Sequence, residues 1–280
     1  MARDLLPLVR QALGDRYTVE REIGRGGAAR VFSATDATGR TVALKVLHPQ
    51  LAASVTADRF LREIKYVSRL DHPSIARLTD YGEGEWIIYY VMDYVPGPTL
   101  RAHLDRVRRA SISDTLHIAN DLLSALACAH REQIVHRDVK PENIVLSPGG
   151  AVLVDFGIAK AVAEAGSDRL TRSGFAVGTS AYMSPEQIAG MEDIDARSDL
   201  YSLGCVLFEC LAGRPPYDDP YDDLVLTKHQ TADVPDVRNH RKDTPPALAQ
   251  AILRSMAKVR EERWPTAEAM QAAISALAPT

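Results

Sequence analysis

The sequence has 280 residues and a formal net charge of −4, from 33 basic and 37 acidic side chains. Its 46% hydrophobic and 25% charged residues exclude the disordered and fibrous classes, and its length fits one large domain or two small ones, each able to bury a core. The slightly acidic balance gives no overall electrostatic reason to bind nucleic acid, so we expect no nucleic-acid partner.

The cysteines and the apolar segments indicate a cytoplasmic protein. Cys205 and Cys210 lie in the apolar stretch 203–211 without histidine neighbours, as expected for reduced core thiols rather than a disulfide or a metal site. The longest apolar run, residues 200–213, contains Glu209 and is shorter than the roughly 20 residues that span a bilayer. The N-terminus lacks a signal-peptide pattern. We therefore expect no membrane segment in this chain.

Residues 1–16 predict a helical extension. Asp4 can cap a short helix that tolerates Pro7 in its first turn. The apolar face of this helix consists of Leu5, Leu8, Val9 and Leu13. We expect the face to be buried, either against the chain's own small lobe or, as the alternative, in a homodimer.

Residues 17–95 predict a β-rich region with one helix. Runs rich in β-branched and aromatic residues, separated by turn residues such as Gly39, predict strands over residues 17–23, 30–35, 41–47 and 86–95. Residues 55–70 predict a helix because Phe60, Ile64, Val67 and Leu70 repeat at helical spacing.

After the Pro-Gly-Pro segment 96–98, the pattern becomes mostly helical. Helices are predicted over residues 113–130, capped by Ser113, over residues 196–211, from Thr244 with Pro245 in the first turn, and from Thr266. The sequence therefore predicts an α+β fold with a small β-rich lobe and hinge, residues 17–95, and a larger, mainly helical lobe, residues 96–280.

A glycine-rich loop and a lysine stand out in the β-rich region. The loop contains Gly24, Gly26 and Gly27 between two strands, so backbone N–H groups can approach nucleotide phosphates. Because a strand follows, the loop is not a dinucleotide fingerprint; taken alone, a glycine-rich hairpin is more often a plain turn. Lys45 lies in an apolar strand and, if buried, needs a partner such as Glu63; the alternative is an exposed edge lysine.

Two further motifs place several polar groups close together. Residues 134–143 contain Asp138, Lys140 and Asn143 in one short loop. Asp155 follows in an Asp-Phe-Gly sequence, after a hairpin that turns at residues 149–150. In this order, after the glycine loop and the lysine strand, the motifs resemble those of the eukaryotic-type protein kinase family, and more narrowly of its bacterial Ser/Thr kinases, such as the catalytic domains of PASTA receptor kinases.

The resemblance covers residues 17 to about 277 and implies a bilobal protein kinase fold that transfers phosphate from ATP to proteins. It implies that the glycine loop covers the phosphates of ATP and that Lys45, oriented by Glu63, binds the α- and β-phosphates. The residues that it implies around the nucleotide are Ile23, Gly24, Gly26, Gly27, Val31, Ala43, Lys45, Met92, Asp93, Val95 and Val145. In this arrangement Asp93 and Val95 offer hinge backbone groups to the adenine.

The resemblance also implies the groups that act on the reacting atoms. Asp138 accepts or orients the proton of the substrate hydroxyl, and Lys140 approaches the γ-phosphate. Asn143 and Asp155 are the implied ligands of Mg²⁺, with Mn²⁺ as an alternative.

Other matched residues have implied structural roles. Thr179 would bond the catalytic loop, and Glu186 and Arg263 would form a buried ion pair. Asp199 would anchor the catalytic-loop backbone, although an acid at a helix N-terminus explains it nearly as well. His136 and Phe156 are interpreted as packing residues.

Substrate class and regulation follow from the same resemblance. The lysine two residues after Asp138 and the segment 178–186 are similar to the Ser/Thr pattern. Arg137 is a fixed cation beside the site, and phosphorylated Thr171 or Ser173 would be its partner in an autophosphorylation switch.

Two departures, Ala29 in place of a third glycine and Ser184 before Pro185, leave every implied catalytic group present. The alternatives are a pseudokinase scaffold and a small-molecule phosphotransferase. The acidic stretch 217–223 is interpreted as a solvated loop rather than a docking site for basic substrates. Bacterial relatives also make the cytosolic domain of a single-pass receptor kinase an open interpretation.

Overall fold

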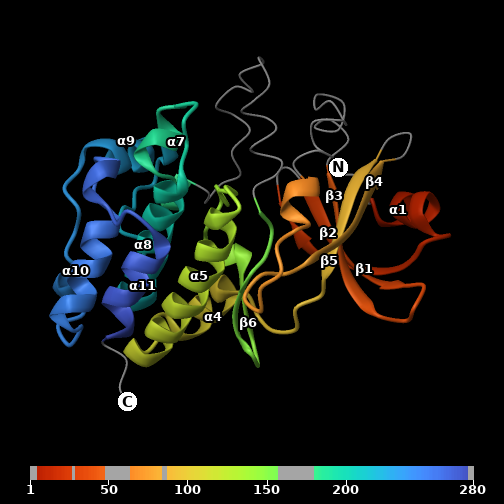
Figure 1. Cartoon of the computed structure of the whole chain (residues 1–280), viewed down its shortest axis with the longest axis horizontal. Helices are drawn as coiled ribbons and strands as arrows, with labels where there is room; N and C mark the ends of the chain where they lie inside the picture. Colours follow the sequence, from red (N-terminus) through yellow and green to blue (C-terminus); the bar gives the residue numbers. More distant parts are fainter. Residues whose placement is uncertain (1–4, 27–28, 48–63, 84–86, 157–179, 277–280) are drawn as a thin grey trace. The chain divides into compact units, whose positions relative to one another are not determined.

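The computed structural model describes residues 5–26, 29–47, 64–83, 87–156 and 180–276. These residues divide into two compact units (Figure 1). The first contains the described residues up to Asp71 together with Ala76–Val95. The second contains His72–Ile75, residues 96–156 and the described residues from 180 onward.

The first unit is built on an antiparallel sheet with the order β1-β2-β3-β5-β4. Its strands are β1 Tyr17–Arg25, β2 Ala29–Asp36, β3 Thr41–Leu47, β4 Leu78–Glu83 and β5 Ile88–Asp93. The turn between β2 and β3 has Gly39 at a φ of +83°, a left-handed conformation that glycine adopts at little cost. Residues 64–67 form the described part of the predicted helix.

The sequence prediction missed β4 at the sheet edge. This strand carries one buried apolar residue, Leu78, and its other positions are half-buried or exposed. Such a strand lacks the alternating apolar pattern by which strands are predicted.

Helix α1, Leu6–Leu13, packs against one face of this sheet (Figure 1). Leu5, Val9 and Leu13 are buried in a cluster that includes Phe32 and Leu44 of the sheet. The apolar face of the extension is therefore covered within the chain, which was the first of the two predicted alternatives.

Two details of this prediction were wrong. Leu8 is 38% exposed, because the buried positions follow an i, i+4, i+8 repeat that places Leu8 on the flank of the helix. Leu5 is the N-cap residue and makes no side-chain cap hydrogen bond; the predicted cap, Asp4, lies outside the described residues. The Arg10 side chain instead ties the helix to β1, donating to the carbonyl of Val19 at 2.8 Å.

The second unit is mainly helical (Figure 1). Its longer helices are α4 Leu100–Val107, α5 Ile112–Arg131, α8 Ala196–Ala212, α9 Asp222–Thr231, α10 Pro246–Ser255 and α11 Ala267–Ser275. Short helical segments are Pro141–Asn143, Ser180–Tyr182, α7 Pro185–Ile188, Val237–Asn239 and Arg260–Glu262. A hairpin of β6 Ile144–Ser147 and β7 Gly150–Leu153 completes it. Helix α8 is buried throughout residues 198–212, so it is the centre of this unit's core.

The helix starts differ from the predictions by one or two residues. Ser111, not Ser113, caps α5, because its hydroxyl accepts the N–H of Asp114. Pro245 is the N-cap of α10 and Pro246 opens its first turn, where a missing N–H costs nothing.

Helices α4 and α9 were not predicted. Only Val225 and His229 of α9 are buried, so it lacks an apolar stripe, and α4 is only two turns long. The stretch 217–223, expected as a solvated loop, is a loop only as far as Tyr221. Asp222 and Asp223 lie in the first turn of α9, where acidic side chains interact favourably with the helix dipole.

Cys205 and Cys210 are fully buried free thiols, as predicted, and Cys128 is half-buried. Burial raises the pKa of both buried thiols, so they are inert. Among the described residues, no helix combines the length and apolar character needed to cross a membrane.

Replacement of Leu13 tests how much α1 contributes to stability. Leu13→Ala removes a side chain that is 5% exposed, and we expect the free energy of unfolding to fall by about 2–4 kcal/mol in urea denaturation. The matched control Leu8→Ala, at an exposed position, should change it by less than about 0.5 kcal/mol. Equally small effects of the two substitutions would show that the helix contributes little.

Candidate active site

The second unit brings three of the predicted site residues into direct contact. The Nζ of Lys140 lies 2.8 Å from Oδ2 of Asp138. The Nδ2 of Asn143 donates to the same oxygen at 2.9 Å, and to the Asp138 carbonyl at 2.9 Å. A cation and an amide therefore fix the orientation of the Asp138 carboxylate.

Asp199, on the first turn of α8, holds the loop that carries Asp138. Its Oδ2 accepts the backbone N–H of His136 and its Oδ1 that of Arg137, each at 2.8 Å. Arg137 has a φ of +65°, in a region that non-glycine residues rarely adopt. His130 adds a contact that the sequence did not reveal: its Nε2 lies 2.8 Å from Oδ2 of Asp199.

Asp155 lies beside Asn143 because of the β6–β7 hairpin. The N–H of Val154 donates to the carbonyl of Asn143 at 2.9 Å, and Asp155 itself has a φ of +67°. The ring of Phe156 packs on His136 with centroids 4.6 Å apart. His136 is fully buried, and burial lowers its pKa, so its ring is neutral and acts in packing.

Asn143 and Asp155 form a donor set that fits Mg²⁺. Since the amide nitrogen of Asn143 is committed to Asp138, its amide oxygen is the atom left for a cation. Mg²⁺ prefers oxygen ligands and uses few protein groups, keeping waters and substrate phosphates as its other ligands. A closed cage of acids is therefore not required, and the described residues contain no cluster of three or more His, Cys, Asp or Glu side chains that could hold a metal.

Glu186 of α7 and Arg263 form a bidentate ion pair. Their two N–O distances are 2.6 and 2.8 Å, and the side chains are 5% and 0% exposed. Burial raises the pKa of Glu186. The hydrogen bonds and charge of Arg263, together with the hydrogen bond from the Ser198 hydroxyl, lower this pKa by more, so the net shift is downward. The pair is charged at neutral pH.

Ser184, one of the two departures from the family pattern, is the N-cap of α7. Its hydroxyl accepts the N–H of Gln187, whose side chain accepts the N–H of Ser184 in return. This reciprocal capping explains the serine at this position, because alanine has no hydroxyl to accept the N–H of Gln187.

In the first unit, the predicted nucleotide residues share one face of the sheet. Val31 pairs with Lys45, and Ala43 pairs with Met92. Directly paired residues point to the same side, so these four side chains lie opposite the face that packs on α1. Lys45 is half-buried, and its Nζ lies 5.7 Å from the centre of the Tyr90 ring.

The remaining described nucleotide residues lie in or beside β1, β5 and, in the second unit, β6. Ile23 and Gly24 are in β1, and Gly26 closes the hairpin by donating to the carbonyl of Ala29 at 2.9 Å. Asp93 ends β5, and its N–H donates to the carbonyl of Arg77 at 2.9 Å. Val95 follows it, and Val145 lies in β6 of the second unit. Five predicted site residues lie outside the described residues: Gly27, Glu63, Thr171, Ser173 and Thr179.

The sequence did not reveal a partly buried polar cluster around Arg101. It gathers Glu142, Tyr182 and Glu209. The one available signal was Glu209 itself, a charged residue in the middle of an apolar run.

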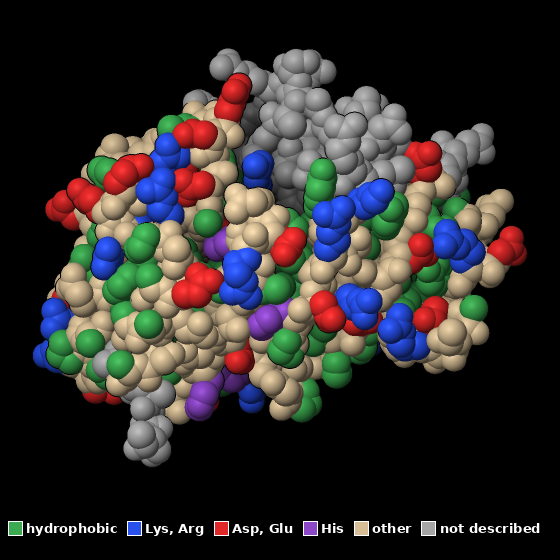
Figure 2. Space-filling view, viewed as in Figure 1, with side chains coloured by type: hydrophobic (Ala, Val, Ile, Leu, Met, Phe, Trp, Pro, Cys, Tyr) green, Lys and Arg blue, Asp and Glu red, His purple; other side chains and the backbone are tan. Residues whose placement is uncertain are grey.

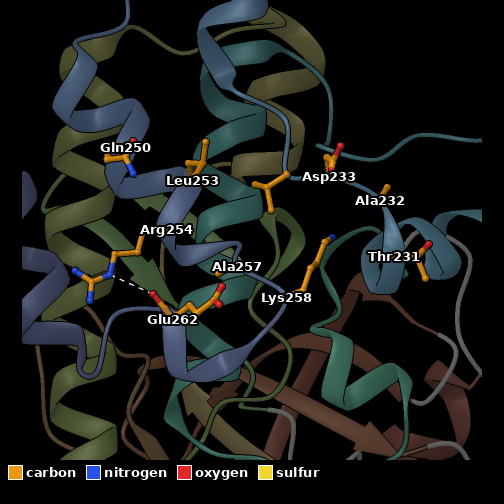
Figure 3. A pocket seen from close by; sticks show the side chains of 10 residues that line it. Thr231, Ala232, Asp233, Gln250, Leu253, Arg254, Ala257, Lys258 and Glu262 are labelled. Atoms are coloured by element: carbon orange, nitrogen blue, oxygen red, sulfur yellow. Dashed lines mark hydrogen bonds between the residues drawn. The ribbon is translucent and has the colours of Figure 1, made fainter.

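A separate surface pocket lies in the second unit, with a volume of about 410 Å³ (Figure 3). Its lining comes from residues 231–234 and 250–262, and none of these is a predicted site residue. Burial lowers the pKa of Lys258 on its wall to about 8. The Nζ of Lys258 donates to Tyr217 at 2.7 Å and to the carbonyl of His229 at 2.8 Å, so the amine supports the end of α9.

On the face drawn in Figure 2, acidic and basic side chains are interspersed over the described surface.

The buried ion pair gives a pH-dependent prediction. At pH 7, Glu186→Gln should lower the free energy of unfolding by about 3–5 kcal/mol, because fully buried Arg263 loses its charged partner. Since folding lowers the pKa of Glu186 from its ordinary 4.5, its contribution is present above that value and is lost as the pH falls through the folded pKa. The deficit of the variant should therefore shrink in denaturation measured below pH 4.5.

The control for that experiment is Glu268→Gln, which breaks an ion pair with Arg131, a side chain that is 64% exposed. It should cost less than about 1 kcal/mol. A deficit of Glu186→Gln that stays constant between pH 7 and pH 3 would contradict the prediction.

Comparison with known proteins identifies the family. The profile described as protein kinase domain matches residues 17–273. The serine/threonine-protein kinase PknB of Mycolicibacterium smegmatis is 42% identical over 275 residues, which cover 94% of this chain and 43% of that protein. The serine/threonine-protein kinase PrkC of Bacillus subtilis is 38% identical over 95% of this chain and 41% of its own length. The chain thus spans less than half the length of these relatives.

A solved structure shows the same fold. The crystal structure of Rad53 residues 1–466 in complex with AMP-PNP superimposes with a TM-score of 0.77 at 24% identity, covering 93% of this chain and 65% of that one. The β-rich first unit and the larger helical second unit correspond to the two lobes of this α+β fold. The chain belongs to the protein kinase domain family, whose members use ATP and a divalent metal, and its relatives are bacterial Ser/Thr kinases.

Proposed function

We propose that this chain is an active Ser/Thr protein kinase that transfers the γ-phosphate of ATP to hydroxyl groups of proteins. The observation that carries the proposal is the contact of Lys140 and Asn143 with one oxygen of Asp138, on a loop held by Asp199. Phosphoryl transfer requires little covalent chemistry from the protein, because positioning and charge stabilisation supply most of the catalysis.

The geometry supports a specific division of labour. Asp138 orients the acceptor hydroxyl and takes its proton, and Lys140 stabilises charge that develops on the transferred phosphoryl group. Asn143 and Asp155 would hold Mg²⁺, or Mn²⁺ as the alternative, and this cation would neutralise phosphate charge.

Nucleotide binding is assigned to the first unit. Lys45, oriented by Glu63, binds the α- and β-phosphates under the glycine loop, and Val31 and Ala43 contact the adenine. Asp93 and Val95 offer backbone groups to the adenine edge, with Met92 behind them. The alignment of Val31, Ala43, Lys45 and Met92 on one sheet face supports this assignment.

Protein substrates and a cytoplasmic location are part of the same proposal. The segment Ser180–Glu186, fixed by the Glu186–Arg263 pair, would support the acceptor protein. A small-molecule phosphotransferase has no need of such a support.

A homodimer formed through α1 is a weaker proposal than a monomer, because the apolar face of α1 is already covered within the chain.

Replacement of Asp138 tests the chemistry and separates an enzyme from a pseudokinase scaffold. With Mg-ATP and a basic protein as acceptor, Asp138→Asn should reduce the rate of radiolabelled phosphate transfer by a factor of about 100 or more while nucleotide affinity stays within about twofold. Asp243→Asn, at a position 69% exposed, is the matched control and should be neutral. Absence of transfer by the wild-type chain would favour the scaffold.

Replacement of two hydroxyls tests regulation. We propose that autophosphorylation at Thr171, Ser173 or both orders their segment through Arg137, because a phosphate and a guanidinium form strong bidentate pairs. The double variant Thr171→Ala, Ser173→Ala should therefore lose about tenfold or more in kcat/KM towards an added protein. Phosphopeptide mapping checks the sites, and full activity of the double variant would refute the switch.

A further inference from the structure

Four segments of the second unit meet at the guanidinium of Arg101. Its Nε donates to Oε1 of Glu142 at 2.9 Å. Its Nη1 and Nη2 donate to the two carboxylate oxygens of Glu209 at 2.8 and 3.1 Å. Nη2 also donates to the hydroxyl of Tyr182, which in turn donates to Glu209. Arg101 comes from α4, Glu142 from the helical turn Pro141–Asn143, Tyr182 from Ser180–Tyr182 and Glu209 from α8.

The cluster is buried on one side and exposed on the other. Tyr182 and Glu209 are each 4% exposed, whereas the side chains of Arg101 and Glu142 are 28% and 43% exposed. Burial lowers the pKa of Arg101, but the hydrogen bonds and charge of Glu209 raise it by more. Burial, and then the charge of Glu209, raise the pKa of Tyr182. The cluster is therefore an arginine cation between two acids, with a neutral phenol.

Arg101 links two parts of the candidate site, in addition to the bond that Nε2 of Gln187 donates to the carbonyl of Arg137 at 2.9 Å. Glu142 directly precedes Asn143, the residue that bonds the Asp138 carboxylate. Tyr182 lies in the segment that continues to Glu186, and its carbonyl accepts the hydroxyl of Ser202 at 2.7 Å. Within the described part of the chain, Glu142 and Tyr182 share no hydrogen bond, and both bond to Arg101.

We propose that Arg101 is a positioning residue for the acceptor protein. It couples the loop of Asp138 and Asn143 to the segment 180–186, so that an acceptor bound on this segment keeps a fixed position relative to Asp138. The proposal rests on the proposed function, because it names how the same site holds its protein substrate. The planar guanidinium suits this role, since its fork engages Glu209 with two nitrogens while a third reaches Glu142.

A double-mutant cycle separates coupling from a merely structural role. Glu142→Gln removes the charge from one partner of Arg101, Tyr182→Phe removes the hydroxyl of another, and both keep the side-chain shape. Each should lower kcat/KM for a protein acceptor by about fivefold, and the double variant by about fivefold rather than the product of about 25-fold, because either change weakens the same link. The affinity for ATP should stay within about twofold in all three variants.

The same pair of changes is then measured in an Arg101→Lys background, which retains the cation but lacks the fork. There, each change should alter kcat/KM by less than about twofold, because the link is already absent. Melting temperatures confirm that each variant is folded. Arg131→Lys, which alters an exposed ion pair with Glu268 in the same unit, is the matched control and should leave the cycle unchanged.

Multiplicative effects of Glu142→Gln and Tyr182→Phe in the active wild-type background would overturn the proposal and leave the kinase function standing. Effects of equal size in the wild-type and Arg101→Lys backgrounds would overturn it as well. Absence of phosphate transfer by the wild-type chain is a different outcome, since it would refute the proposed function and the inference with it. The cycle in the wild-type background needs no change at Arg101, so its result stands even where Arg101→Lys does not fold.

Discussion

The loop that carries Asp138 depends on one buried carboxylate. Asp199 is 1% exposed, and both of its oxygens accept backbone N–H groups of this loop. These bonds hold Arg137 at a φ of +65°, a conformation that costs about 1–3 kcal/mol for a non-glycine residue. The carboxylate would in turn be costly to bury without such donors. The strained loop and the buried acid therefore stabilise each other, and neither is expected to persist alone.

Other buried polar side chains of helix α8 also hold neighbouring segments by hydrogen bonds. Because the helix is buried throughout residues 198–212, its contacts are mostly apolar, and apolar attraction is not directional. Several of its polar side chains bond the surrounding segments: Ser198 bonds Glu186, Asp199 bonds the loop of Asp138, and Glu209 bonds Arg101 and Tyr182. Hydrogen bonds are directional, so these side chains set the positions of the surrounding segments more sharply than the core does.

The sequence revealed the catalytic residues of the site better than the residues and elements that hold them in place. The residues 134–143 were predictable because phosphate and metal chemistry require particular side chains at short spacing in the chain. Arg101 was not, since its partners come from three segments distant in sequence, and nothing local to α4 indicates them. The same limit explains the missed β4 and α9: an edge strand and a helix with two buried residues owe their form to neighbours, not to their own periodicity. Leu8 shows that an apolar residue on a predicted helix is not thereby buried.

The two faces of the β-sheet explain how a lysine can lie within an apolar strand. In β3, Leu44 and its alternate neighbours pack under α1, while Lys45 and Ala43 point to the opposite face. The run Thr41–Leu47 alone does not show which face is which, because it is apolar on both sides of the lysine. Pairing with β2 and β5 decides it, since a slip of one residue would turn the ammonium into the cluster beneath α1. The strand pairing therefore keeps Lys45 on the face predicted to bind nucleotide, and burial of Leu44 beneath α1 favours the same register.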